Sequence, residues 1–197
     1  MNVNELLPDE LIVIHQALER DGLPHAFGGA IALAFCGVPR FTQDIDINLA
    51  AKVGEHPRVL DVLSSLFPIT DRERIENEIS QGAQARLKWG VTPVDLFFSE
   101  LPFHESLMVR IRDVDYAGVR IQVISAEDLI ICKTAYNRGK DWADIENIFR
   151  VAGPDIALEY LRYWLDDFFP PEDERIRKIE TYISIYATRS ESDVSDS

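Results

Sequence analysis

The chain has 197 residues, of which 46% are hydrophobic, and this apolar content excludes an intrinsically disordered protein. Its 20 basic and 34 acidic residues give a formal net charge of −14, which argues against tight, non-specific binding to nucleic acid. No apolar run reaches the roughly 20 residues that a membrane-spanning helix needs, and the N-terminal residues show no signal-peptide pattern. We therefore expect a cytoplasmic protein with no membrane partner and with Cys36 and Cys132 as reduced thiols.

Hydrophobic periodicity predicts a mixed order of helices and strands in the first part of the chain. Helices are expected over residues 8–20, 30–35 and 56–67. Strands are expected over residues 24–27, 44–49, 80–89, 93–98, 107–112 and 119–124, with a turn at Gly90 and another at residues 115–118. The last two strands would form a hairpin.

After Ser125 the pattern becomes entirely helical, with helices expected over residues 126–137, 140–151, 154–168 and 173–186. The order predicts an α/β (α+β) fold: a mixed sheet flanked by helices, followed by a C-terminal helical subdomain. The expected divisions are an α/β core over residues 1–124, a helical subdomain over 125–187 and a disordered tail over 188–197.

Three aspartates are the candidates for chemistry. Asp44 and Asp46 lie two apart on a predicted strand, so their carboxylates point to the same face, about 7 Å apart along the strand. Asp95 lies in an otherwise apolar predicted strand, where an aspartate is costly unless it is paired or binds a metal. Three such carboxylates suit a two-metal site. The alternative is a solvated edge strand, and a second Asp-x-Asp at Asp113 and Asp115 has the look of a turn feature.

Gly28 and Gly29 lie between a predicted strand and a predicted helix. Two glycines at this place let the backbone approach a phosphate closely, and the helix N-terminus supplies free amides. The plain alternative is a tight strand-to-helix turn. The Gly-x-Gly-x-x-Gly and Walker A patterns are both missing, so neither a Rossmann dinucleotide site nor a P-loop is supported.

In combination these motifs resemble the DNA polymerase β-like nucleotidyltransferase superfamily, and within it the AbiEii-like toxins and related bacterial proteins. The resemblance covers roughly residues 23–150. It rests on Gly28-Gly29-Ala30, on Arg40-x-Thr42-x-Asp44-Ile-Asp46, on the strand with Asp95 and on Lys133 followed by Arg138-Gly-Lys140-Asp141-Trp-Ala-Asp144. One departure is Gly29, because many superfamily members carry serine there.

The resemblance implies a nucleotidyltransferase-type sheet and a role for each matching residue. Asp44, Asp46 and Asp95 would be catalytic and would bind Mg²⁺ or Mn²⁺. Nucleotide binding, with ATP among the candidate NTPs, would involve Gly28, Gly29, Arg40, Thr42 and Lys133. Accessory roles would fall to Lys140, Asp141 and Asp144.

The function implied is metal-dependent transfer of a nucleoside monophosphate from an NTP to an acceptor hydroxyl. The acceptor would be a tRNA, a protein or a small molecule, and the resemblance implies a toxin–antitoxin setting with an antitoxin protein as partner. The alternative is a catalytically inactive nucleotide-binding regulatory or interaction protein with the same fold. His15, His25, His56 and His104 show no metal-ligand spacing, so each is expected to be a surface or partly buried histidine.

Overall fold

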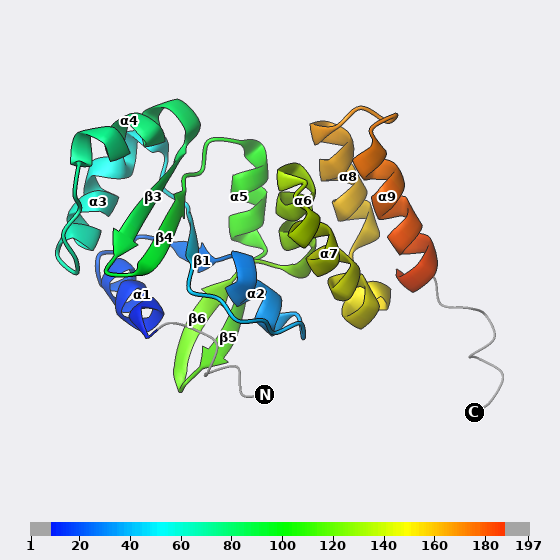
Figure 1. Cartoon of the computed structure of the whole chain (residues 1–197), viewed down its shortest axis with the longest axis horizontal. Coiled ribbons are helices and arrows are strands. Elements are labelled where there is room, and N and C mark those ends of the chain that lie inside the picture. Colours follow the sequence, from blue (N-terminus) through cyan, green and yellow to red (C-terminus); the bar gives the residue numbers. More distant parts are fainter. Residues whose placement is uncertain (1–8, 188–197) are drawn as a thin grey trace. The chain divides into compact units, whose positions relative to one another are not determined.

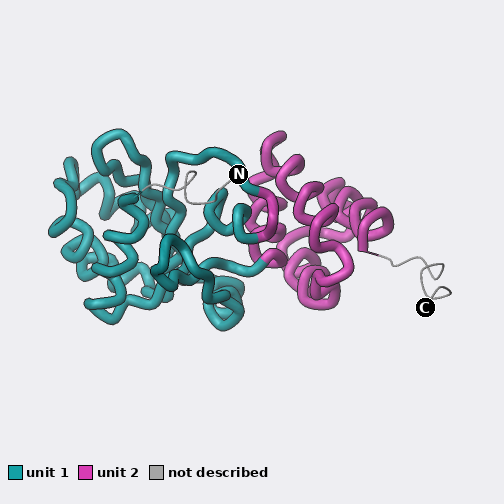
Figure 2. The backbone as a smooth tube through the Cα atoms, turned by 90° about the horizontal axis from the view of Figure 1, so that it is seen from below, with its two compact units in different colours: residues 1–35, 39–125 teal, residues 36–38, 126–197 magenta. Residues whose placement is uncertain are grey.

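The computed structural model describes residues 9–187, so the expected tail over 188–197 lies outside the described residues. The chain forms two compact units (Figure 2). Unit 1 comprises residues 1–35 and 39–125, and unit 2 comprises residues 36–38 and 126–197. The predicted fold class is confirmed, because unit 1 combines a mixed sheet with helices and the described part of unit 2 is helical.

Within residues 9–187, a six-stranded mixed sheet in the order β3-β4-β2-β1-β6-β5 forms the centre of unit 1 (Figure 1). Its strands are β1 (His25–Phe27), β2 (Ile45–Leu49), β3 (Gln84–Trp89), β4 (Thr92–Phe97), β5 (Arg112–Tyr116) and β6 (Val119–Val123). The pairs β1–β6 and β2–β4 are parallel, and the pairs β1–β2, β3–β4 and β5–β6 are antiparallel. The parallel pair β2–β4 brings the two segments with the candidate aspartates side by side.

Helices and one short turn complete the described part of unit 1. They are α1 (Glu10–Arg20), α2 (Gly29–Phe35), the short 3₁₀ turn η2 (Val53–Glu55), α3 (His56–Ser64), α4 (Arg72–Gly82) and α5 (Pro102–Val109). Leu11, Ile14 and Leu18 follow the helical period along α1 and are fully buried. Helix α1 packs against α3 and β6, and α2 packs against β2 and β6.

Unit 2 is a small helical bundle. Its described elements are α6 (Ala126–Tyr136), α7 (Gly139–Ala152), η3 (Gly153–Asp155), α8 (Leu158–Phe168), α9 (Glu174–Tyr182) and the π-helical turn η4 (Ile183–Ala187). Helix α6 packs against α7 and α8 around buried side chains that include Ile130, Ile145, Phe149, Leu161 and Ile179. Among the helices of residues 9–187, none has the length and apolar character needed to cross a membrane.

Two of the expected strands are wrong in part. The strand expected over 80–89 begins only at Gln84, because residues 72–82 form helix α4. The strand expected over 107–112 is mostly helix α5, and β5 begins at Arg112. Helix α5 has a proline at its start, a position that favours helix initiation.

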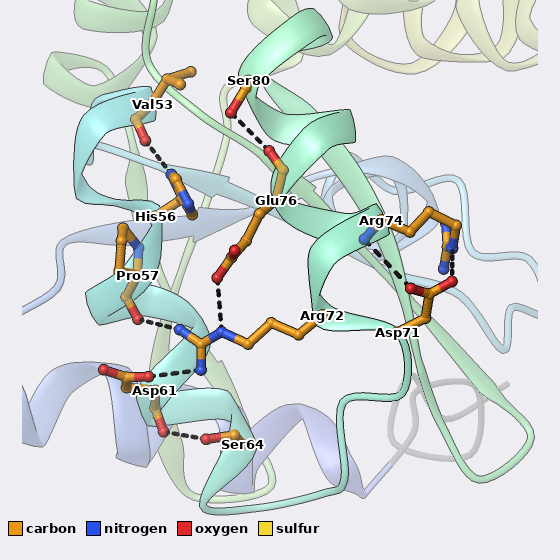
Figure 3. A network of polar contacts seen from close by, with 10 residues as sticks. All are labelled: Val53, His56, Pro57, Asp61, Ser64, Asp71, Arg72, Arg74, Glu76 and Ser80. Atoms are coloured by element: carbon orange, nitrogen blue, oxygen red, sulfur yellow. Dashed lines mark hydrogen bonds and ion pairs between the residues drawn. The ribbon is translucent and has the colours of Figure 1, made fainter.

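Charged contacts rather than an apolar stripe characterise helix α4 (Figure 3). Asp71 caps the helix by accepting a hydrogen bond from the backbone N–H of Arg74. Arg72 Nε lies 2.8 Å from Glu76 Oε1, and Arg72 Nη1 lies 2.8 Å from Asp61 Oδ1 on α3. Because the helix is so polar, its hydrophobic periodicity is weak and the sequence pattern underestimates it.

Candidate active site

Asp44 and Asp46 face the same side of the sheet. Asp44 directly precedes β2 and Asp46 is its second residue, so the pleat of the strand points both carboxylates in one direction. The buried Thr42 fixes the approach to the strand: its Oγ1 accepts a hydrogen bond from the Asp44 backbone N–H at 3.1 Å. Both aspartates are partly exposed, which leaves their oxygens accessible.

Asp95 joins this pair through the parallel register of β2 and β4. Asp46 and Asp95 are direct Cα partners, and neighbouring strands lie about 4.8 Å apart. Their side chains therefore project from the same face. Asp44, Asp46 and Asp95 are called the carboxylate cluster below.

Arg86 of β3 contacts the carboxylate cluster from the other side of β4. It is the Cα partner of Asp95, and its guanidinium binds that carboxylate with both ends, at 2.6 Å from Nε to Oδ1 and 2.5 Å from Nη2 to Oδ2. The side chain of Arg86 is 64% exposed, whereas that of Asp95 is 14% exposed. The hydrogen bonds and charge of Asp95, followed by the charges of Asp44 and Asp46, raise the pKa of the Arg86 guanidinium. All three carboxylates thus act on one cation.

The two glycines lie on the opposite flank of Asp46. Gly28 N donates a hydrogen bond to Asp46 O at 2.9 Å, and a Cβ on Gly28 would lie 2.8 Å from Asn48 Nδ2. Gly29 has a φ of +54°, and a Cβ there would lie 1.8 Å from Asp46 Oδ2. Any side chain at Gly29 would displace the Asp46 carboxylate, so this position needs glycine for both its backbone conformation and its contact.

The remaining predicted site residues lie on other segments of the chain. Arg40 is partly exposed in the segment before β2. Lys133, on α6 of unit 2, is buried with its Nζ 2.6 Å from Asp144 Oδ2 and 3.7 Å from Asp141 Oδ1. Lys140 is exposed near the start of α7. The predicted roles of Arg40 and Lys133 in nucleotide binding, and the accessory role of Lys140, stay predictions.

Asp141 is the hub of the polar cluster in unit 2. Arg138 binds its carboxylate through Nε at 2.6 Å and Nη2 at 3.1 Å, and the Arg138 backbone N–H donates to it at 3.2 Å. Burial alone would raise the pKa of Asp141, but the hydrogen bonds of Arg138 and the charge of Lys133 outweigh burial and lower that pKa. Asp141 is therefore a charged anchor at the start of α7.

Two features of unit 1 escaped the sequence analysis. Arg86 was not among the predicted site residues. The tight turn at Gly90 offers a signal for it, because counting along the hairpin on both sides of this turn pairs Arg86 with Asp95. The expectation of surface or partly buried histidines is wrong for His15 and His25, which are 6% and 1% exposed, and His15 Nδ1 lies 3.0 Å from His25 Nε2. A turn after α1 brings them together, and sequence spacing alone does not reveal this.

A comparison with protein-family models decides the family. The model described as "Nucleotidyl transferase AbiEii toxin, Type IV TA system" matches residues 15–181. The chain belongs to the AbiEii nucleotidyltransferase toxin family. This finding confirms the resemblance drawn from the glycine and aspartate motifs.

Solved structures share the fold of this AbiEii family member. The lincosamide antibiotic adenylyltransferase LnuA, with lincomycin bound, matches with 15% identity and a TM-score of 0.53, over 74% of this chain and 98% of LnuA. The antibiotic-resistance factor ANT(2'')-Ia in solution matches with 17% identity and a TM-score of 0.58, over 94% of this chain and 100% of that chain. A crystal structure of ANT(2'')-Ia with adenylyl-2''-tobramycin matches with 14% identity and a TM-score of 0.50, over 88% and 97% of the two chains. No curated protein matches the sequence.

Proposed function

We propose that this AbiEii-family protein transfers a nucleoside monophosphate from an NTP to an acceptor hydroxyl and releases pyrophosphate. The observation that carries the proposal is the convergence of the carboxylate cluster on one face of the sheet, with Asp46 packed against Gly29. Family membership supports the same reaction class.

The residues present suit a divalent cation. Carboxylates from two adjacent strands project from one face of the sheet; Asp95 binds the guanidinium of Arg86, and the charges of Asp44 and Asp46 also act on this cation. Hard oxygen donors favour Mg²⁺ or Mn²⁺ over softer metals. When bound, such an ion would neutralise triphosphate charge and lower the pKa of the attacking hydroxyl.

The chain's own groups then have distinct tasks. Asp44 and Asp46 would hold the ion and the triphosphate in position, and the absence of a side chain at Gly29 leaves room for the Asp46 carboxylate. A bond would form between the acceptor oxygen and the α-phosphorus, and the bond from that phosphorus to the bridging oxygen of pyrophosphate would break. Asp95 would accept the hydroxyl proton at a second lone pair of an oxygen that Arg86 already contacts.

Three classes of acceptor are in view: tRNA, protein and small molecules. The net charge of −14 favours a protein or a small molecule over a broad RNA surface. The toxin–antitoxin setting of the family supports including an antitoxin protein among the partners. The folds of LnuA and ANT(2'')-Ia, named for antibiotic substrates, support including small hydroxyl compounds among the acceptors tested.

The test is to incubate the purified protein with each α-labelled NTP and Mg²⁺ or Mn²⁺, together with total RNA, cell protein or a small-molecule extract. The double variant Asp44→Asn/Asp46→Asn serves as the inactive control, and Asp113→Asn serves as a matched change in the other Asp-x-Asp pair. Label should move into one pool with the intact protein and with Asp113→Asn only. NTP binding without transfer into any pool would instead indicate a nucleotide-binding regulatory protein.

A further inference from the structure

Helix α1 and strand β1 bring two histidines and a glutamate together, away from the carboxylate cluster. His15 and Glu19 are four residues apart on α1 and therefore share one face of the helix. His25 is the first residue of β1. One ligand atom from each of the three lies within 4.8 Å of the other two. These three residues are called the histidine cluster below.

The two imidazoles are already close to the spacing that a tetrahedral metal requires. Zinc–nitrogen bonds of about 2.0–2.1 Å at a tetrahedral angle place the two nitrogens about 3.3–3.4 Å apart. His15 Nδ1 and His25 Nε2 are 3.0 Å apart, so a shift of a few tenths of an ångström would suffice. The pair is nearly preformed for shared ligation.

The tautomer of His25 is set by its backbone partner. His25 Nδ1 lies 2.8 Å from the carbonyl oxygen of Leu23, which can only accept, so Nδ1 carries the proton. His25 Nε2 therefore accepts the hydrogen bond that His15 Nδ1 donates, and a metal ion held by both nitrogens would take the place of this shared proton. A ligating histidine that donates its other N–H to a backbone carbonyl is the usual outer-shell arrangement at metal sites.

The surroundings also suit a metal. His15 and His25 are 6% and 1% exposed, and the ring of Phe27 lies near both, at centroid distances of 6.3 Å and 5.7 Å. Burial lowers the pKa of His25. Glu19 is exposed and supplies a negative charge on the solvent side, where water can complete the coordination.

We infer that the histidine cluster binds a divalent transition-metal ion of the zinc type, with water as the fourth ligand. Two imidazoles and one carboxylate favour such an ion over Mg²⁺, so the site differs in chemistry from the carboxylate cluster. The two sites also lie at different ends of β1. His25 is its first residue, whereas Gly28 directly follows its last residue and donates a hydrogen bond to Asp46. Along the strand, His25 and Gly28 are about 10 Å apart. The ion would fasten α1 to β1 and stabilise unit 1.

The test uses the full chain, stripped with EDTA and then titrated with Zn²⁺ in competition with a chromophoric chelator. The wild type should bind one equivalent tightly, and Glu19→Gln should bind it at least about tenfold more weakly, a loss that even outer-shell changes produce. Glu73→Gln, an exposed glutamate on α4, should leave the affinity unchanged. Because Glu19 is exposed, its variant is expected to fold, and circular dichroism checks this.

Two further measurements assign the ion to the histidine cluster. Co²⁺ should give the visible spectrum of a tetrahedral site in the wild type and in His56→Gln, and this spectrum should be lost in His15→Gln. The Asp44→Asn/Asp46→Asn variant should retain the zinc equivalent. The inference is overturned if no zinc binds, if Glu19→Gln and His15→Gln bind it like the wild type, or if the equivalent disappears with the carboxylate cluster. Since the readout is binding, it does not depend on transfer activity.

Discussion

Replacing Gly29 by alanine tests the contact between the glycine turn and the carboxylate cluster. Gly29 has a φ of +54°, and forcing an alanine into this left-handed region costs about 1–2 kcal/mol. The new Cβ would lie 1.8 Å from Asp46 Oδ2, so the carboxylate must leave its rotamer at a further cost of about 0.5–1.5 kcal/mol. The free energy of unfolding should therefore fall by about 1.5–3.5 kcal/mol.

Gly90→Ala is the matched control. Gly90 has a φ of +60°, but a Cβ there would meet nothing within 4 Å. Urea unfolding of Gly90→Ala should show only the backbone cost of about 1–2 kcal/mol. The difference between the two variants measures the contact with Asp46.

A double-mutant cycle with Asp46→Ala checks the assignment. In that background the nearest remaining atom of residue 46 is its Cβ, 3.3 Å from the new methyl group, so most of the clash is gone. We expect a coupling of about 1 kcal/mol between the two substitutions. Equal losses for Gly29→Ala and Gly90→Ala, together with no coupling, would refute the reasoning. Transfer activity of Gly29→Ala should also fall, by about a hundredfold for a carboxylate misplaced by about 1 Å.

Three more substitutions test other parts of the structure. Arg86→Met removes a cation that competes for Asp95, so Mn²⁺ titration should show tighter binding. The control Arg74→Met should leave the Mn²⁺ affinity unchanged. Weaker binding of Mn²⁺ in Arg86→Met would contradict this prediction. Lys133→Met removes the buried cation that lies 2.6 Å from Asp144 and 3.7 Å from Asp141, and it should cost about 3–5 kcal/mol in urea unfolding, while the exposed Lys140→Met should stay within about 0.5 kcal/mol. Hydrogen bonds from Arg175 lower the pKa of the Asp173 carboxyl group from 3.8 to about 2. The stabilisation that this ion pair gives is therefore present above pH 3.8 and is lost as the pH falls toward 2. The difference in urea midpoint between wild type and Asp173→Asn should shrink over that range, and a constant difference would contradict the assignment.

The sequence predicted which face of the strand carries Asp44 and Asp46, but not how Asp95 comes to lie beside them. Alternation along β2 was enough to place Asp44 and Asp46 on one side of a strand. Strand β4 pairs with β2 in parallel and places Asp95 beside Asp46. This pairing depends on contacts between segments that are distant in the sequence. Local sequence patterns do not encode such pairing. Asp95 was predicted to be the third carboxylate because it lies in an apolar segment and because of the family resemblance.

The elements that were missed have weak hydrophobic patterns. Helix α4 buries only Ile75 and Ile79 and otherwise relies on ion pairs, so its apolar periodicity is faint. The histidine pair depends on a turn that follows α1, in which Gly22 has a φ of +63°. Neither feature can be read from residue spacing, because both depend on tertiary packing.

The most direct test of the central claim compares label transfer by Asp46→Asn and Asp113→Asn under identical conditions. Both changes replace the charge of one aspartate in an Asp-x-Asp pair on a strand of the same sheet. Asp46→Asn should abolish transfer from α-labelled NTP, because it removes a carboxylate that faces Asp95, whereas Asp113→Asn should retain the wild-type rate. Transfer that survives in Asp46→Asn would contradict the assignment of the carboxylate cluster as the catalytic site.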